Sequence, residues 1–269
     1  MEQRQITRLS VPVVGMGTSG TLDLPDKDQP LATLVIEAAL DAGSTLIDSS
    51  PMYGRAEAVS GRALADRRAE ALIATKVWTE DDDEAERQIE ASLSYFGGHV
   101  ELFQVHNLLA WRTRLDQLQA RRDAGQLTLI GATHWKPAAF EELEKVMRTG
   151  RLDAIQIPYN PVEREVEARI LPLADELGLG VLVMRPFGGG ELAGRRVRDA
   201  DLRPLAEFGI TSWPGALLAW GLSDARISCA IPATSKPERA RANAAAGTGP
   251  WLDADARRLV QRIATGSDG

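Results

Sequence analysis

Four polar side chains that can hold or move a proton stand at the ends of short apolar runs or just beyond them. Asp48 follows Leu-Ile, Lys76 follows Leu-Ile-Ala-Thr, and His106 follows Leu-Phe-Gln-Val. Tyr53 comes five residues after Asp48, in the turn-forming stretch Ser-Ser-Pro-Met-Tyr-Gly. If the runs are parallel strands, their carboxyl ends open on one face, where α/β enzymes carry their chemistry. An acid, a phenol, an amine and an imidazole on that face can form a proton-donating device.

The phenol is the natural proton donor of this group, although alone it is a poor one. A tyrosine with a pKa of about 10 donates little at neutral pH. We expect the Lys76 ammonium to lower the pKa of Tyr53, and the Asp48 carboxylate to keep that ammonium charged and in place. His106 can orient a carbonyl oxygen or relay a proton. Singly, these residues could be a turn cap, a rim aromatic, a solvated strand end and a core histidine, but their shared position favours the joint role.

Eight apolar runs would position these residues, and most of them lie about 25 to 33 residues apart. They lie near Val13, Leu46, Leu72, Leu102, Leu129, Ala154, Val181 and Ile227. The intervening segments 31–39, 84–93, 137–147 and 170–177 have helical apolar periodicity. A strand, a helix and two loops fill such an interval. The pattern predicts an α/β fold, a (β/α)8 TIM barrel.

The chain contains no long linker or low-complexity tract, so we expect one domain over residues 1–269. The unit after the seventh run is enlarged at about 185–210, where three consecutive glycines and several arginines occur. Long loops at the catalytic end of a barrel usually carry function. A last helix is expected at about 253–264, packed on the barrel.

Composition excludes several classes of protein. The net charge of −7 and pI near 5.2 argue against a nucleic-acid partner, which needs a basic face. The single cysteine, Cys229, lies in an apolar run and cannot form an internal disulfide. The first residues lack an apolar signal region, and no stretch approaches the length of a membrane span. We expect a cytoplasmic protein without a membrane partner, monomeric or weakly homo-oligomeric.

One motif is misleading. Residues 15–20 read Gly-Met-Gly-Thr-Ser-Gly after an apolar run, as the phosphate turn of a Rossmann fold does. In that fold the third glycine opens a helix, whereas Thr-Leu-Asp-Leu-Pro-Asp follows here and cannot begin one. The Tyr-x-x-x-Lys pair of short-chain dehydrogenases is also absent after each tyrosine. The motif therefore does not predict a Rossmann domain.

Several motifs together resemble the aldo-keto reductase family. They are Leu-Ile-Asp-Ser-Ser-Pro-Met-Tyr-Gly, Ala-Thr-Lys-Val-Trp, Gln-Val-His-Asn and, near the end, Ile-Pro-Ala-Thr-Ser-Lys-Pro-Glu-Arg. The likeness covers almost the whole chain and keeps motif order and spacing. It implies a barrel that binds extended NADP(H) without a Rossmann domain and reduces a small aldehyde or ketone. By this resemblance Tyr53 is the general acid, Lys76 and Asp48 tune it, and His106 orients the carbonyl.

The segment after the eighth run has its own signal for a phosphate. A helix is expected from Pro237, which places Thr234, Ser235 and Lys236 at its N-terminus, where backbone N–H groups and the helix dipole favour an anion. Arg239 lies one turn in and can meet a 2′-phosphate. The alternative is a capped helix with solvated cations. The resemblance assigns these residues to the 2′-phosphate and Asn243 to the adenine, so NADPH is favoured over NADH.

The resemblance implies further cofactor contacts, with two departures from the usual pattern. They are Gly17, Thr18, Asp48, Thr133, His134, Gln156, Met184, Arg185, Pro186 and Gly188. Gln156 would hold the nicotinamide carboxamide. Thr133-His134 replaces the more usual Ser-Asn. Met184 replaces an aromatic residue that stacks on nicotinamide, either as a softer packing group or as core filler, and Arg185 could pair with the pyrophosphate.

Three tryptophans just past strand ends, Trp78, Trp111 and Trp135, are candidates for the substrate wall, and ordinary rim packing is the alternative. Two rival functions remain. The first is a non-catalytic NADP(H)-binding redox sensor or regulatory subunit. The second is a metal-dependent barrel enzyme using His106 and His134, but the three histidines form no ligand cluster, so we expect no metal site.

Overall fold

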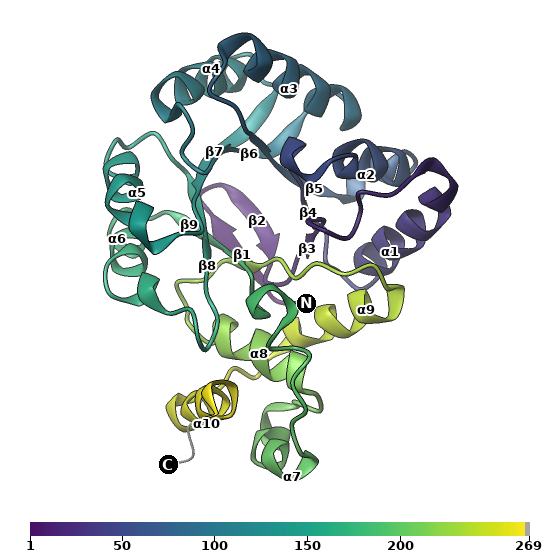
Figure 1. Ribbon diagram of the computed structural model, residues 1–269, viewed down its shortest axis with the longest axis vertical. Coiled ribbons are helices and arrows are strands. Elements are labelled where there is room, and N and C mark those ends of the chain that lie inside the picture. Colours follow the sequence, from purple (N-terminus) through teal and green to yellow (C-terminus); the bar gives the residue numbers. More distant parts are fainter. Residues whose placement is uncertain (267–269) are drawn as a thin grey trace.

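A barrel of eight parallel strands forms the centre of the protein in a computed structural model that describes residues 1–266 (Figure 1). The barrel strands are β3 (Met16–Gly17), β4 (Leu46–Asp48), β5 (Leu72–Val77), β6 (Val100–His106), β7 (Leu127–Thr133), β8 (Ala154–Pro158), β9 (Gly180–Met184) and β10 (Cys229–Ala230). Neighbouring strands follow chain order from β3 to β10. Parallel bridges from Val14 to Ala230 and from Gly17 to Ala233 join the first strand to the last. The predicted (β/α)8 barrel is confirmed.

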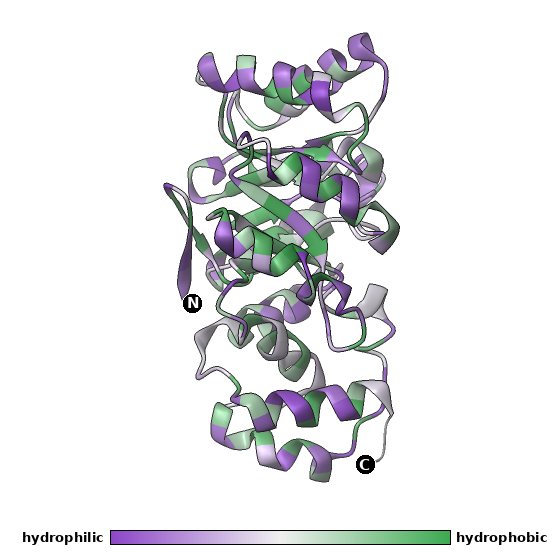
Figure 2. Ribbon diagram, turned by 90° about the vertical axis from the view of Figure 1, so that its left-hand side faces the viewer, coloured by the Kyte–Doolittle hydropathy of each residue, from purple (hydrophilic) through white to green (hydrophobic). Residues whose placement is uncertain are grey.

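Helices lie on the outside of the barrel. Those that connect successive strands are α1 (Gln29–Asp41), α2 (Ala56–Leu64), α3 (Asp82–Tyr95), α4 (Trp111–Asp123), α5 (Phe140–Met147), α6 (Ile170–Glu176), α7 (Asp199–Leu202) and α8 (Trp213–Leu222). Helices α9 (Pro237–Ala245) and α10 (Ala254–Thr265) follow the last strand. Short 3-10 helices lie between several of them. Figure 2 shows hydrophobic strands in the interior and hydrophilic outer helix faces, as expected for helices that cover a barrel. None of the helices in the described part of the chain is long and apolar enough to cross a membrane.

The start of the chain contains a hairpin that the apolar runs did not predict. The apolar run near Val13 predicts the first barrel strand, and Val14 does bridge Ala230 of the last strand. Before this run, β1 (Gln3–Ile6) and β2 (Leu9–Pro12) form an antiparallel hairpin, and the regular strand β3 begins at Met16. Ile6 and Val11 from the hairpin join the apolar cluster inside the barrel. The hairpin therefore closes the amino-terminal end of the barrel, opposite the end where α/β enzymes bind their ligands.

Strand alternation divides the barrel interior into layers. Leu46, Ala74 and Leu102 belong to the enclosed apolar cluster. Two residues further along the same strands stand Asp48, Lys76 and Gln104, all buried. Because side chains two apart on a strand point to the same face, both sets point into the barrel. The interior thus changes from apolar to polar toward the carboxyl ends of the strands.

The segment between β9 and α8 is the longest connection on that end. It contains the 3-10 helix η6 (Gly188–Gly190), the short α7 and a second 3-10 helix, η7 (Arg203–Phe208). Figure 1 shows α7 and α10 projecting from one side of the barrel. Arg195 from this segment donates to the carbonyl of Ala264, so the segment is attached to the end of α10.

Candidate active site

A buried ion pair lies at the polar end of the barrel interior. Lys76 Nζ lies 2.8 Å from both carboxylate oxygens of Asp48 and 2.7 Å from the carbonyl oxygen of Ser49. Both side chains are almost completely shielded from solvent. Burial lowers the pKa of Lys76, but the attraction and hydrogen bonds of Asp48 together with the charges of Tyr53 and Glu57 outweigh it, so the pKa is raised. Burial raises the pKa of Asp48 against the pull of Lys76, and the two-oxygen contact with Nζ holds the pair as carboxylate and ammonium.

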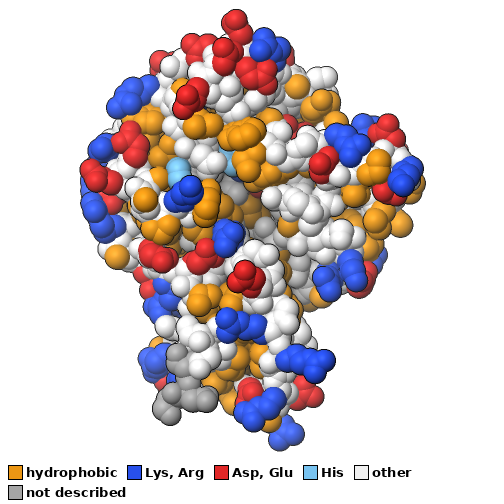
Figure 3. Space-filling model, in the orientation of Figure 1, with side chains coloured by type: hydrophobic (Ala, Val, Ile, Leu, Met, Phe, Trp, Pro, Cys, Tyr) orange, Lys and Arg blue, Asp and Glu red, His pale blue; other side chains and the backbone are white. Residues whose placement is uncertain are grey.

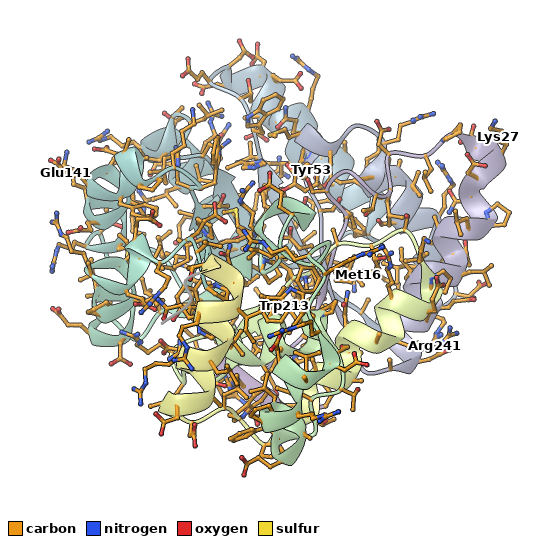
Figure 4. The ribbon with its side chains drawn as sticks, turned by 60° about the horizontal axis from the view of Figure 1, so that its bottom comes forward. Met16, Lys27, Tyr53, Glu141, Trp213 and Arg241 are labelled. Atoms are coloured by element: carbon orange, nitrogen blue, oxygen red, sulfur yellow. The ribbon has the colours of Figure 1, made fainter. Side chains whose placement is uncertain are left out.

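A tight turn carries Tyr53 over this pair. Ser50 caps the 3-10 helix η2 (Pro51–Tyr53): its Oγ accepts the N–H of Met52 at 3.2 Å, and its carbonyl accepts the N–H of Tyr53 at 2.9 Å. Gly54 ends the turn at φ +63°, a conformation that favours glycine. Figure 4 shows Tyr53 near the centre of the molecule, with Lys27 and Glu141 at the outer edges.

The four predicted proton-handling residues lie together. Lys76 Nζ lies 5.3 Å from the centroid of the Tyr53 ring. The centroids of the Tyr53 and His106 rings are 5.9 Å apart, and the two planes are nearly perpendicular at 87°. The phenol ring therefore lies close to both the ammonium and the imidazole, and Asp48 pairs with the ammonium. The structure brings together all four residues that the strand ends indicated.

One expectation about Tyr53 is wrong. The cation was expected to make the phenol more acidic than an ordinary tyrosine, but the pKa of Tyr53 is raised. Burial is the largest cause, the Lys76 charge opposes it, and the Asp48 charge adds to it. The Lys76 ammonium partly offsets the rise in the pKa of Tyr53 that burial causes, but does not reverse it. At neutral pH the phenol therefore keeps its proton and has it to give.

His106 is neutral. Burial, together with repulsion from Lys76 and His134, lowers its pKa to about 3. Its Nδ1 lies 2.9 Å from Ser50 Oγ, which is fully buried. A neutral imidazole has one N–H donor and one acceptor nitrogen, so it can donate to a carbonyl oxygen from only one of its two nitrogens.

Two amides extend the polar layer across the barrel. Gln104 Nε2 lies 3.5 Å from Asp48 Oδ1 and donates to Gln156 Oε1 at 2.9 Å. The Oε1 of Gln104 is buried and has no partner among the described residues. A Cβ on Gly131 would lie 2.9 Å from the Cγ of Gln104, so the glycine makes room for this side chain. Sequence reasoning missed Gln104 and Ser50. A glutamine at an inward position of an apolar strand, beside a strand glycine, was the available signal for Gln104.

A cleft of about 460 Å³ opens beside Tyr53. Its lining residues are Gly17, Ser19, Gly20, Thr21, Asp48, Tyr53, Gln156, Met184, Arg185, Pro186, Phe187, Gly189, Gly190, Ile231, Pro232 and Ala233. This volume is in the range of small-molecule sites, roughly 300–1,000 Å³. Figure 3 shows the hollow end of the barrel bordered by hydrophobic and histidine side chains. The cleft runs from the proton-handling group toward the start of α9.

Predicted cofactor residues from β7 and β9 lie at this end of the barrel. Thr133 is buried, and its Oγ1 has no partner within residues 1–266. The Nδ1 of His134 accepts the N–H of Lys136 at 3.0 Å. Arg185 lines the cleft at φ +55°, and its Nε lies 3.1 Å from Glu163 Oε1. The guanidinium that was expected to meet a pyrophosphate is thus already held by a carboxylate.

The amino-terminal end of α9 carries the predicted phosphate residues. Helix α9 begins at Pro237, as expected, and no side chain caps it. Ser235, Lys236 and Arg239 are exposed, whereas Thr234 and Asn243 are buried. No ion pair within the described part of the chain involves Lys236 or Arg239. Of the remaining predicted contacts, Gly17, Asp48, Gln156, Met184 and Pro186 line the cleft, whereas Thr18 and Gly188 are not among its lining residues.

The three tryptophans do not line this cleft. Trp78 and Trp135 are 40% and 45% exposed at the end of the barrel. The Nε1 of Trp111 donates to Glu142 on α5 at 2.8 Å, which directs that indole toward a neighbouring helix. No group of three or more metal-ligating side chains occurs within residues 1–266.

The sequence model of the aldo/keto reductase family matches residues 13–263. The chain belongs to this family. The resemblance seen in the motifs is therefore confirmed. The match includes all eight barrel strands and the whole polar layer.

Individual relatives are distant. The chain is 28% identical over 214 residues to the aldo-keto reductase YhdN of Bacillus subtilis, covering 72% of this chain and only 63% of that relative. It is 24% identical to the NADH-specific methylglyoxal reductase of Escherichia coli, over 93% of this chain and 94% of that enzyme. An aldo/keto reductase from Klebsiella pneumoniae in complex with NADP and acetate superposes with a TM-score of 0.78 at 20% identity, over 94% and 92% of the two chains.

Proposed function

We propose that this protein reduces a small aldehyde or ketone to an alcohol with NADPH, and that Tyr53 is the general acid. The observation that carries the proposal is a phenol close to both a buried ammonium and a neutral imidazole, in the lining of a cleft. In this proposal the group that takes up a proton at this position is the carbonyl oxygen of the substrate. The reverse reaction, oxidation of an alcohol, uses the same groups.

The residues of the cleft fit a nicotinamide dinucleotide. Gln156 lines the cleft, and Thr133 pairs with it on the neighbouring strand and has a buried Oγ1 without a partner within residues 1–266, so the two side chains can offer hydrogen bonds to a carboxamide. The cleft then leads past Ala233 to the start of α9, where backbone N–H groups and two cations that form no ion pair with any described residue favour a phosphate. A nicotinamide held there would supply a hydride to the carbonyl carbon. Met184, Gly189 and Gly190 line the path between the two ends.

The side chains of this protein supply the proton and the orientation. Tyr53 donates to the carbonyl oxygen as negative charge develops on it, and Lys76 stabilises the phenolate that remains. Asp48 keeps Lys76 charged and fixed. His106 holds the carbonyl oxygen by a hydrogen bond and does not compete for the proton, because its pKa of about 3 keeps it neutral.

Turnover and its loss test this function. NADPH oxidation at 340 nm (a wavelength at which reduced nicotinamide absorbs) against a panel of aldehydes, ketones, sugars and quinones should reveal substrates. We expect Tyr53→Phe to lower kcat by roughly 10²–10⁴, with unchanged folding and NADPH binding. A Tyr53→Phe protein that turns over normally contradicts the assigned acid. A wild-type protein that binds NADPH but reduces none of these compounds favours a non-catalytic redox sensor.

We propose that Lys236 and Arg239 set the preference for NADPH. The relatives do not decide it, because one is named as NADH-specific and another was crystallised with NADP. Each of the two cations can form a charge-assisted bond to a 2′-phosphate, which NADH lacks. We expect Lys236→Ala with Arg239→Ala to weaken NADPH binding by at least about tenfold while leaving NADH binding unchanged. Arg241→Ala, an exposed arginine on the same helix, is the matched control.

A further inference from the structure

Ser50 makes two contacts that join separate parts of the site. Its backbone and side chain start the turn that carries Tyr53, and the same side-chain oxygen contacts the ring of His106. The hydroxyl is fully buried and so is shielded from bulk solvent. Its contacts are therefore those that the folded chain supplies.

The hydrogen of this hydroxyl has one acceptor. Ser50 Oγ has a single hydrogen and two lone pairs. The N–H of Met52 donates to one lone pair at 3.2 Å. The only other partner of Ser50 Oγ within residues 1–266 is His106 Nδ1, at 2.9 Å. If Nδ1 carried a proton, that N–H would donate to Oγ, and the buried hydroxyl hydrogen would have no acceptor, which costs free energy.

We propose that Ser50 is a positioning residue that fixes His106 as the Nε2–H tautomer, leaving this N–H to bind the carbonyl oxygen of the substrate. The arrangement assigns the Ser50 hydroxyl as donor and Nδ1 as acceptor. This assignment matters because the ring is neutral and therefore carries its one N–H on either Nδ1 or Nε2. An imidazolium would donate from both nitrogens. Nε2 itself has no hydrogen-bond partner within the described residues.

The consequence rests on the function proposed for His106. With the other tautomer, Nε2 would present a lone pair to the lone pairs of a carbonyl oxygen, and the hydrogen bond that orients the substrate would be lost. Ser50 thus acts on two groups of the site. Its part in the turn positions the phenol of Tyr53, and its hydroxyl sets the tautomer of the His106 ring. Aldehyde or ketone binding then requires no proton movement on His106.

Nitrogen NMR tests the tautomer without turnover. Histidine labelled with ¹⁵N gives long-range proton correlations that distinguish Nδ1–H from Nε2–H, and the chain has only three histidines. His106→Asn assigns the signals by removing one set. We expect wild-type protein at pH 7.5 to show His106 as Nε2–H. A wild-type His106 that is mainly Nδ1–H overturns the proposal, whatever the behaviour of any variant.

Two serine variants separate the tautomer from the loss of a cap. Ser50→Ala removes the donor, and we expect His106 to become a mixture of tautomers and kcat to fall roughly ten- to a hundredfold at unchanged NADPH affinity. Ser212→Ala is the matched control, since Ser212 also caps a helix by accepting a backbone N–H at 3.2 Å, from Gly215, and lies away from the cleft. It should leave the His106 signals and kcat unchanged. Ser50→Ala protein with His106 still entirely Nε2–H overturns the proposal.

The two hypotheses fail differently. Absence of carbonyl turnover in wild-type protein refutes the proposed function, and the NMR signature still reports on Ser50. An unchanged tautomer in Ser50→Ala refutes the role of Ser50, and Tyr53→Phe still tests the general acid.

Discussion

The two ends of the barrel interior use the same strands for opposite purposes. At the closed end Leu46 and Leu102 pack with the β1–β2 hairpin, and the cluster contains only apolar side chains. Two residues further along these strands, Asp48 and Gln104 are equally buried but polar. Burying apolar groups stabilises the fold, whereas burying charges costs free energy unless they are paired. The comparison shows that the apolar layer stabilises the barrel, and that the same strands thereby hold the polar, reactive layer in place.

Breaking the ion pair is the strongest test of the polar end. Lys76→Met would leave the Asp48 carboxylate buried without its cation, and we expect the free energy of unfolding to fall by roughly 3–5 kcal/mol. Urea unfolding at pH 7.5 measures the change. The double variant with Asp48→Asn should recover much of this loss, although neither protein should be active. A single Lys76→Met variant as stable as wild type would show that the pair adds nothing to folding.

Truncation at the closed end should affect stability alone. Leu102→Ala leaves a cavity in the apolar layer, and we expect a loss of roughly 2–5 kcal/mol in the free energy of unfolding. Because Leu102 belongs to the apolar layer and not to the proton-handling group, kcat per folded molecule should stay at the wild-type value. The check is urea unfolding combined with active-site-normalised kinetics. A large fall in kcat would mean that the two layers are not separable.

A buried acid behind β5 makes the stability of the protein depend on pH. Glu57 accepts hydrogen bonds from Thr75 and Ser92, and burial raises its pKa from 4.5 to about 7. Between those values the unfolded chain has released the proton and the native protein still holds it. Stability therefore decreases as pH rises from 4.5 to about 7, by up to about 3 kcal/mol.

Glu57→Gln should remove this contribution. The amide oxygen can still accept from both hydroxyls, so the variant should resemble wild type near pH 4 and be more stable near pH 8. Denaturant unfolding across this range measures the difference, and parallel curves for the two proteins would rule out the shifted acid. This effect is expected to be the smallest of the three. It comes from the burial of a single carboxyl group, and that group makes no direct contact with the site.

Much of the architecture could be predicted from local pattern. The spacing of the apolar runs gave the eight barrel strands, and the break after residues 15–20 argued correctly against a Rossmann turn. Asp48, Lys76 and His106 were identified because each ends a strand, and strand ends meet on one face of a barrel. The hairpin was missed because Gln3–Ile6 has little apolar character and its pairing depends on the strand that follows.

Other properties depend on distances that no local pattern contains. The sequence by itself determined which strands form and which reactive side chains end them, since strand periodicity and turn chemistry are local. Only the tertiary structure decided that burial raises the pKa of Tyr53. It also decided that Gln104 reaches past Gly131 to Gln156, and that the Ser50 hydroxyl contacts the ring of His106. The physical reason is that solvation and hydrogen bonding are set by which groups lie within a few ångströms, and in a barrel those groups come from different strands.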